Sequence, residues 1–295
     1  MFFGISLPHF GGLADARLLA EIALEAEEAG WDGFFIWDHI VWGLTGEPMV
    51  DPWIALTAAA MTTQRIKLGP MVTPLPRRRP TKVARETVSL DRLSGGRLIL
   101  GVGIGDGPNE WENLGDNYDA KTRGAMLDEA LGVLSRAWTG EVVNHEGPHY
   151  KVKDSIFVPT PVQERIPVWV AGTWPTKTEI KGTAPFRRAA RWGGVFPIAR
   201  DLGWTDMLSP QHIMDIGNLV QEHRQSDEPF DMVLGGISTG DPSEDAGIVA
   251  PYAEVGVTWW VENVIPHRYG GWDWGDPWPL EKMRERIRKG PPTSG

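Results

Sequence analysis

The chain has 295 residues, of which 41% are hydrophobic and 23% are charged. This length suits either two average domains or one α/β barrel with a large buried core. The chain contains no cysteine, which excludes disulfides, thiolate metal sites and cysteine nucleophiles. Its formal net charge of -10 argues against general nucleic-acid binding, and no apolar run is long enough to cross a bilayer. Residues 1–8 read as a strand and not as a signal peptide, so we expect a cytoplasmic protein.

Apolar runs of strand length alternate with helical patterns along the chain. Asp15 is expected to cap the first helix, and Asp51 followed by Pro52 to begin the second, because these residue types favour helix starts. A helical pattern follows each expected strand. The expected strands are 2–7, 33–37, 66–73, 98–103, 166–171, 194–198, 232–238 and 257–264.

Residues 141–165 interrupt this alternation. Glu146-Gly147-Pro148 marks a turn between two short alternating runs, which predicts a hairpin outside the main repeat. The eight strands predict an α/β fold, a single (β/α)8 TIM barrel over residues 1–295, with this excursion between strands four and five. An open doubly wound sheet is the alternative. The glycines at 101, 103 and 105 speak against it, because they lack the spacing of a dinucleotide-binding fingerprint.

The stretch 96–110 is an apolar strand that opens into a glycine-rich, acidic loop. Such loops present polar groups to ligands in α/β enzymes, and glycine lets the backbone approach something flat or bulky. The chain also has 15 tryptophans, mostly in loops and at strand ends. They indicate either a broad aromatic pocket or filler for the barrel and an interface.

In a TIM barrel the residues just after each strand form the active-site face. Asp38 and His39 follow strand two. His39 could act as a general acid or donate a hydrogen bond to a polar ligand atom; the alternative is that it only bonds to a neighbouring loop. Asp38 is either a functional group or the cap of a turn. Asp106 and Glu110 follow strand four, either as acid–base groups or as caps of the long loop.

Arginines follow three of the expected strands. Arg77, Arg78 and Arg79 stand just before a helix, where positive charge opposes the helix dipole and invites an anion. The alternative is a solvated loop paired with nearby acids. Arg200 and Arg268, after strands six and eight, are candidates for phosphate binding or plain surface arginines.

Three segments of the chain resemble a known family. They are Phe34-Phe35-Ile36-Trp37-Asp38-His39, Thr73-Pro74 with Arg79-Pro80, and Leu90-Asp91-Arg92-Leu93-Ser94-Gly95-Gly96-Arg97-Leu98-Ile99-Leu100-Gly101-Val102-Gly103. Together they look like the luciferase-like monooxygenase superfamily, which includes the coenzyme F420-dependent reductases and dehydrogenases. The resemblance covers the whole chain and is strongest over residues 2–140. The third segment is the specific one, whereas the Asp-His pair alone is not.

The resemblance implies a flavin- or deazaflavin-dependent oxidoreductase whose TIM barrel holds reduced FMN or F420 at the carboxyl ends of its strands. His39 and Asp106 would lie near the reactive part of the ring as catalytic residues. No metal is implied. The residues that the resemblance places at the cofactor are Asp38, Met71, Thr73, Arg77, Arg79, Gly172, Thr173 and Arg200.

Two details of the cofactor site follow from the same resemblance. Gly172 and Thr173 would receive the phosphate, although Trp174 stands where small residues are common and no lysine follows strand six. Relatives of this kind carry a bulge and a non-prolyl cis peptide in strand three. By position this bond would join Pro70 and Met71, and it would press the following backbone against one face of the ring.

The choice of cofactor rests on charge and on the Asp38-His39 pair, which resembles the F420 branch. F420 has an acidic tail that Arg77 to Arg79 would meet through charge-assisted hydrogen bonds. We therefore expect hydride transfer between F420 and a small organic substrate. The alternative is a monooxygenase in which reduced FMN, supplied by a separate reductase, reacts with O2. Family habit also suggests a homodimer.

Two functions of other classes stay open at this point. A metal-dependent barrel hydrolase would use side chains that lack a tight ligand spacing in the sequence. These side chains are Asp38, His39, Asp106, Glu110 and His267. A non-catalytic barrel that only binds the cofactor is the second alternative.

Overall fold

The structure is a computed structural model that describes residues 1–43, 46–177, 182–199, 201–270 and 277–292. The strands of its main sheet are β1 Phe2–Leu7, β2 Gly33–Ile36, β3 Lys67–Pro70, β4 Thr73–Pro74, β5 Leu100–Gly103, β8 Val168–Trp174, β9 Gly194–Ala199, β10 Asp231–Gly236 and β11 Trp259–Asn263. The α-helices are α1 Ala16–Glu28, α2 Pro52–Thr62, α3 Pro80–Ser94, α4 Ala120–Ala137, α5 Ala184–Ala189, α6 Pro210–His223, α7 Pro242–Glu254 and α8 Leu280–Arg288.

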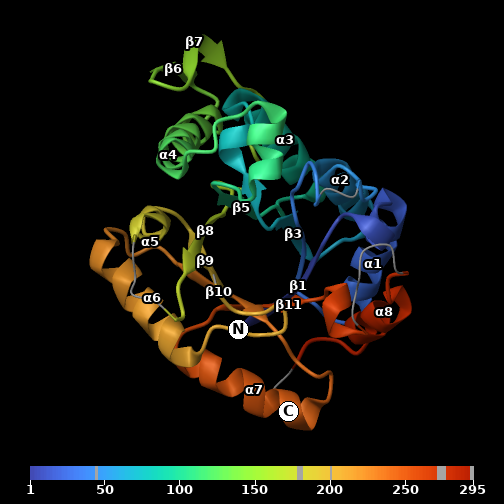
Figure 1. Ribbon diagram of the computed structural model, residues 1–295. Helices are drawn as coiled ribbons and strands as arrows, with labels where there is room; N and C mark the ends of the chain where they lie inside the picture. The colour runs from blue at the N-terminus through green and yellow to red at the C-terminus, as the bar shows by residue number, and fades with distance from the viewer. Residues whose placement is uncertain (44–45, 178–181, 200, 271–276, 293–295) are drawn as a thin grey trace.

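The main sheet is parallel and curls into a barrel with the helices outside it, as Figure 1 shows. Its strand order is β3-β2-β1-β11-β10-β9-β8-β5-β4. Because β3 and β4 are two parts of one barrel strand, the nine strands of the main sheet amount to eight barrel strands. The predicted TIM barrel is therefore confirmed, and the open doubly wound sheet is wrong.

Two helix starts show why the alternation of the sequence was a reliable signal. The Asp15 carboxylate accepts a hydrogen bond of 2.7 Å from the Arg17 N–H at the start of α1. The Asp51 carboxylate accepts one of 2.9 Å from the Trp53 N–H, with Pro52 at the first helical position of α2. Both caps satisfy backbone donors that a helix start leaves unpaired.

The third barrel strand is interrupted between Pro70 and Thr73. The part before the gap pairs with β2 and the part after it with β5. The cis peptide bond joins Met71 and Val72, so the expected cis bond between Pro70 and Met71 was placed one bond too early. The ladder explains the offset, because the Met71 N–H still donates to the Ile36 carbonyl at 2.7 Å.

The ring closes where the third strand meets the fourth. Leu68 and Leu98 form a parallel bridge, and a Cβ placed on Gly69 would lie 1.8 Å from the Ile99 carbonyl oxygen. A Cβ on Gly101 would lie 2.3 Å from the Pro70 carbonyl oxygen. Gly101 thus lets the backbone of the third strand pass close by. The glycine run was expected to make room for something flat or bulky, and at this position it makes room for the backbone of the neighbouring strand.

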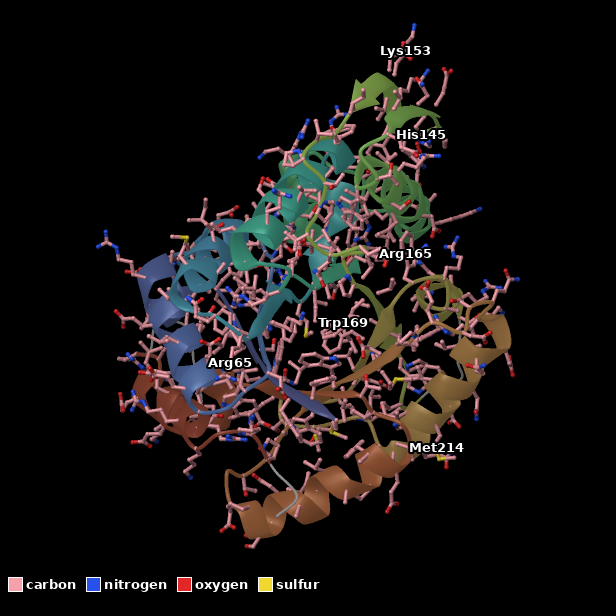
Figure 2. The ribbon with its side chains drawn as sticks, turned by 180° about the vertical axis from the view of Figure 1, so that it is seen from behind. Arg65, His145, Lys153, Arg165, Trp169 and Met214 are labelled. Carbon is pink, nitrogen blue, oxygen red and sulfur yellow. The ribbon has the colours of Figure 1, made fainter. Side chains whose placement is uncertain are left out.

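The barrel is filled by side chains from alternate positions of its strands. Figure 2 shows Trp169 in its middle, and the Trp169 ring packs 5.2 Å from each of the rings of Phe35 and Trp259, centroid to centroid. Met71 and Val261 belong to the same buried cluster. Some tryptophans are therefore barrel filler, as one of the two sequence interpretations held.

The excursion predicted over 141–165 contains a two-stranded antiparallel hairpin, β6 Val142–Glu146 and β7 Lys151–Ile156. It projects away from the barrel beside α4 (Figure 1), with Lys153 near its outer end (Figure 2) and the His145 ring bonded to Glu129 of α4. The hairpin prediction is confirmed. Within the ranges that the structure describes, no helix is long and apolar enough to cross a membrane.

Buried charges anchor the segments that lead into the barrel strands. We call Glu27, Asp91 and Arg97 the amino-end cluster. The Glu27 carboxylate accepts from the backbone N–H groups of residues 64–66, and the Asp91 carboxylate from those of residues 162–163. Arg97 makes five hydrogen bonds of 2.7–3.0 Å, and all of them go to neutral oxygens of α2, α3 and the turn before β3.

Candidate functional site

A second group of charged side chains lies at the opposite, carboxyl end of the barrel. We call Asp38, His39, Arg77, Arg78 and Glu110 the mouth cluster. Asp38 and His39 follow β2, the two arginines follow β4, and Glu110 lies in the loop after β5. Strand ends of a parallel barrel meet on one face, so three chain segments bring these side chains together.

Asp38 is buried and binds the segment after β4. The Thr73 hydroxyl donates to its Oδ2 at 2.8 Å. Arg78 Nη2 lies 2.9 and 2.8 Å from the two carboxylate oxygens, and Arg77 Nη2 lies 3.2 Å from Oδ1. Charge-assisted bonds of this kind compensate for the burial of the carboxylate.

Glu110 connects the arginines to His39. Its Oε1 accepts from the Ile40 N–H at 2.6 Å and pairs with Arg77 Nη1 at 3.1 Å. Burial acts to raise the pKa of Glu110, but the hydrogen bond from His39, the Ile40 N–H and the Arg77 charge together hold that pKa below its usual value. Glu110 is therefore a carboxylate at neutral pH.

His39 donates from Nδ1 to Glu110 Oε2 at 3.0 Å, because a carboxylate can only accept. This bond fixes the tautomer of the neutral ring and leaves Nε2 as an acceptor. Within the part of the chain that the structure describes, Nε2 has no hydrogen-bond partner. The His39 side chain is 23% exposed, so the ring is open to the barrel mouth.

His9 supports His39 from behind and was not among the predicted site residues. Its Nδ1 donates to the Val50 carbonyl at 2.6 Å, and its Nε2 accepts from the His39 backbone N–H at 2.9 Å. The two rings are nearly parallel, with centroids 6.3 Å apart. Burial lowers the pKa of His9 to about 4, so the ring is neutral at physiological pH. The signal available in the sequence was its place directly after strand one.

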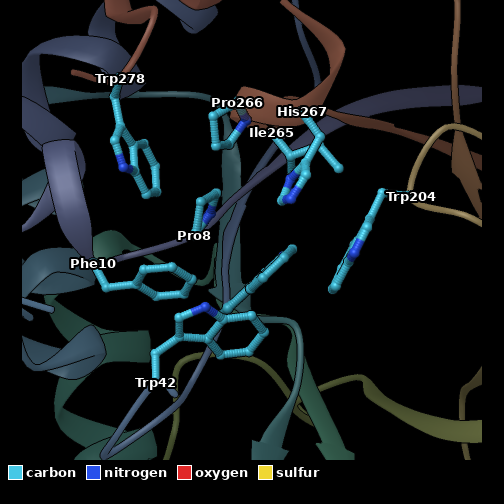
Figure 3. A pocket seen from close by; sticks show the side chains of 9 residues that line it. Pro8, Phe10, Trp42, Trp204, Ile265, Pro266, His267 and Trp278 are labelled. Atoms are coloured by element: carbon cyan, nitrogen blue, oxygen red, sulfur yellow. The ribbon is translucent and has the colours of Figure 1, made fainter. Parts of the chain in front are cut away.

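An aromatic pocket, shown in Figure 3, lies beside the mouth cluster. Its aromatic walls are Phe10, Trp37, Trp42, Trp204 and Trp278, and the remaining lining residues are two prolines, an isoleucine and His267. The Trp42 ring lies 4.7 Å from the His39 ring, centroid to centroid. This pocket agrees with the other interpretation of the tryptophans, that of a broad aromatic pocket. Some tryptophans therefore fill the barrel and others line the pocket.

The structure gives two of the three arginines after strand three internal partners. Arg77 and Arg78 bind Asp38 and Glu110, as the alternative of pairing with nearby acids predicted. Their charges are neutralised inside the mouth cluster, so the expected contact of Arg77 with an acidic tail has no support here. Arg79, at the start of α3, is exposed and keeps that expectation.

Met71 lies in the break of the third barrel strand and Thr73 begins its second part, and both side chains are buried. Met71 packs inside the barrel, and Thr73 bonds to Asp38. Asp106 is exposed and lies near Arg123, whereas Glu110 is the acid that contacts His39. The structure therefore pairs His39 with the other of the two predicted acids.

The expected phosphate residues lie inside β8, which ends three residues later than predicted. A Cβ on Gly172 would lie 2.6 Å from the Pro185 side chain, so this glycine admits the start of α5 and does not face the mouth. The next residue, Thr173, lies on the opposite face of the strand and is exposed. Trp174 packs against Phe186 on the outside, which leaves the mouth clear of its ring. Arg200 lies outside the described residues.

The eighth barrel strand, β11, ends in a buried ion network on the outside of the barrel. Glu262 accepts from Arg268 Nη1 at 2.7 Å and lies 3.6 Å from Arg286 Nε. Arg268 is thus engaged in the wall and does not serve as a free phosphate ligand. No three His, Cys, Asp or Glu side chains of the described ranges gather as a metal site, so the hydrolase alternative has no ligand set there.

Comparison with known proteins places the chain in a family. The model of a family described as luciferase-like monooxygenase matches residues 1–184. The chain belongs to this family. The matched region contains the whole mouth cluster, and the resemblance noted in the sequence is thereby confirmed.

Individual relatives share about half of the chain. The F420-dependent glucose-6-phosphate dehydrogenase of Beutenbergia cavernae is 38% identical over 174 residues, which cover 57% of this chain and 50% of that protein. That of Nakamurella multipartita is 35% identical over 169 residues, covering 56% and 49%. The chain thus spans about half the length of the curated relatives it matches.

Solved structures agree in fold over a longer range. An F420-dependent secondary alcohol dehydrogenase in complex with an F420–acetone adduct superposes with a TM-score of 0.72 at 15% identity, covering 89% of this chain and 92% of that one. The coenzyme F420-dependent tetrahydromethanopterin reductase of Methanopyrus kandleri gives 0.72 at 19% identity, with 98% and 96% covered. These likenesses establish the barrel over nearly the whole chain.

Proposed function

We propose that the protein is an F420-dependent oxidoreductase that transfers a hydride between F420 and a small organic substrate. The observation that carries this proposal is the His39–Glu110 pair at the barrel mouth. It lies in the region that matches the luciferase-like family, whose curated relatives here are F420-dependent dehydrogenases.

The residues at the mouth fit a flat heteroaromatic cofactor. Trp42 Nε1 is buried and has no hydrogen-bond partner among the described residues, and a bound ligand with an acceptor atom would complete it. His39 offers a second polar contact beside it. We propose that the Thr173 hydroxyl binds a phosphate oxygen and that Arg79 meets the acidic tail, since both are exposed on the mouth side of their elements.

Bound F420 would accept a hydride from the substrate carbon or return one to it. The task of the protein is then to move the matching proton. In alcohol oxidation His39 Nε2 takes the hydroxyl proton as the hydride leaves the carbon, and it gives the proton back in the reverse reaction. The Glu110 carboxylate stabilises the imidazolium through Nδ1, and neutral His9 holds the His39 backbone in place.

The test compares the two cofactors on the purified protein. We expect F420 to bind more tightly than FMN in fluorescence titrations. In the absence of oxygen, an alcohol of a substrate panel should lower the absorbance of oxidised F420, and a ketone should restore it from reduced F420. Tighter binding of reduced FMN, with O2 consumed in step with substrate, would instead establish the monooxygenase. Binding of F420 without turnover of any substrate would favour the non-catalytic barrel. Light scattering of the same sample tests whether the protein is a homodimer.

A further inference from the structure

The aromatic pocket differs from the mouth cluster in having no charge. Its nine lining residues, all from described parts of the chain, include no Asp, Glu, Lys or Arg. Burial lowers the pKa of His267, so this ring is neutral at pH 7. The pocket is therefore an apolar wall directly beside His39, the residue proposed to move the proton.

Three arginines near the pocket, all from the described part of the chain, are already engaged. Arg77 and Arg78 are bound to Asp38, and Arg268 is bound to Glu262 on the outside of β11. None of these charges is free to neutralise a phosphate in the pocket. Burying an anion without a cation or several donors is strongly unfavourable.

One side chain of the pocket stands apart from the others. Trp204 is 51% exposed, and its ring stacks against two others. Its centroid lies 5.9 Å from that of Trp37 with a 20° interplanar angle, and 5.4 Å from that of His267 with a 13° angle. Figure 3 shows Trp204 on the side of the pocket opposite Phe10 and Trp278. Trp204 is thus an exposed flat ring on an irregular loop, and it stacks against a wall formed by the rings of Trp37 and His267.

We propose that the wall formed by the rings of Trp37 and His267 binds an uncharged, flat, apolar substrate, which takes the place of the Trp204 ring. Stacking on ring faces favours a planar ligand over a puckered sugar. A ligand on this wall lies beside His39, since the Trp37 and His39 ring centroids are 6.0 Å apart. That this ligand is the substrate rests on the proposed oxidoreductase function. A sugar phosphate, as named for the relatives, does not suit this chain's pocket.

The test measures binding to the protein without any cofactor, by calorimetric titration with 2-naphthol and with 2-naphthyl phosphate. The two probes share one ring system and differ in charge. We expect saturable 2-naphthol binding and at least tenfold weaker binding of the phosphate, since about 1.4 kcal/mol of unpaired charge burial already gives that factor. Glucose 6-phosphate should bind no better than the naphthyl phosphate.

Substitution of Trp204 tests the displacement. Trp204→Ala removes the internal competitor, so 2-naphthol should bind roughly threefold to tenfold more tightly. Ile156→Ala is the matched control, because Ile156 is equally exposed at 52% but lies on the projecting hairpin; it should leave binding unchanged. His267→Ala should weaken binding.

Two results would overturn the proposal. Equal or tighter binding of the phosphate by the unchanged protein would show that the pocket accepts anions. Weaker 2-naphthol binding by Trp204→Ala would show that Trp204 is a fixed wall. Since no cofactor is present in these titrations, both results are independent of whether the protein uses F420. Turnover of glucose 6-phosphate with F420 would reject the proposed substrate class but would agree with the proposed oxidoreductase function.

Discussion

The amino-end cluster and the mouth cluster both bury charged side chains at the ends of the same barrel, but they satisfy them differently. Glu27, Asp91 and Arg97 bond to backbone groups and neutral side chains. In the mouth cluster the charges bond to one another and finish at the His39 ring, whose Nε2 faces the mouth unbonded within the described chain.

This difference separates architecture from chemistry. The carboxylates and the guanidinium of the amino-end cluster are fully used in tying loops to strands, so they have nothing left for a ligand. The mouth cluster ends in a histidine ring that is partly exposed and whose Nε2 can accept a proton. The stretch 90–103, the most specific part of the family resemblance, contributes Asp91 and Arg97 to the first kind of cluster.

Replacing His39 tests the chemical side of the contrast. His39→Ala should lower turnover by roughly 10²–10⁴-fold, because it removes the group that moves the proton. The unfolding free energy should change little, since the ring is partly exposed. Turnover and urea unfolding of the same preparation check both, with the exposed His223→Ala as control. A large loss of stability with normal turnover per folded molecule would make His39 a structural residue.

Replacing Arg97 tests the structural side. Arg97→Met leaves several buried carbonyl oxygens without donors, so the unfolding free energy should fall by about 3 kcal/mol or more. Turnover per folded molecule should be unchanged. Arg92→Met, an exposed arginine of the same segment with one hydrogen bond of 3.2 Å to Thr160, should cost far less. Loss of turnover in Arg97→Met at full stability would break the distinction.

His9 should make the mouth side sensitive to acid. Burial lowers its pKa from 6.5 to about 4, so between these values the unfolded chain binds more protons than the folded chain and stability falls as the pH falls. A difference of about 2.5 pH units corresponds to about 3 kcal/mol. His9→Gln keeps an acceptor for the His39 N–H but does not titrate, so its urea unfolding should lose that much less between pH 7 and pH 4 than the unchanged protein. Parallel pH profiles would contradict the assignment.

Glu110 should have the smallest effect of the four, because it acts through His39. Glu110→Gln keeps an acceptor for Nδ1–H but removes the charge that stabilises the imidazolium, so turnover should fall roughly 10- to 100-fold. The exposed Glu112→Gln is the matched control. In a His39→Ala background the same change should have no further effect on turnover. Additive losses in the double variant would mean that Glu110 acts independently of His39.

The barrel and its hairpin could be predicted because their signals are local. Asp15, Asp51 and Pro52 mark helix starts within a few residues, and the apolar runs alternate with helical patterns over the whole chain. The break in the third strand was expected, but its position depends on one ladder bond between Met71 and Ile36, which no sequence pattern shows.

The site was only partly predictable, because its contacts join distant segments. His39 and Glu110 were both candidates from their places after strands two and four, but 71 positions separate them and nothing in the sequence chose Glu110 over Asp106 as the partner. The partners of Arg77 also come from other segments: its guanidinium pairs with Asp38 and Glu110, and the sequence does not show this pairing. Trp204 lacks any local signal, and His9 is marked only by its place after strand one, since each matters through a ring or a bond from another loop.

The contrast between the two ends is tested most directly by single-turnover hydride transfer. Absorbance of F420 would be followed without oxygen, with the alcohol of the panel that reduces it, at equal concentrations of folded protein. The account predicts that His39→Ala slows the transfer by roughly 10²–10⁴-fold while Arg97→Met proceeds at the unchanged rate. Equal rates for His39→Ala and the unchanged protein, or equal losses in both variants, would contradict it.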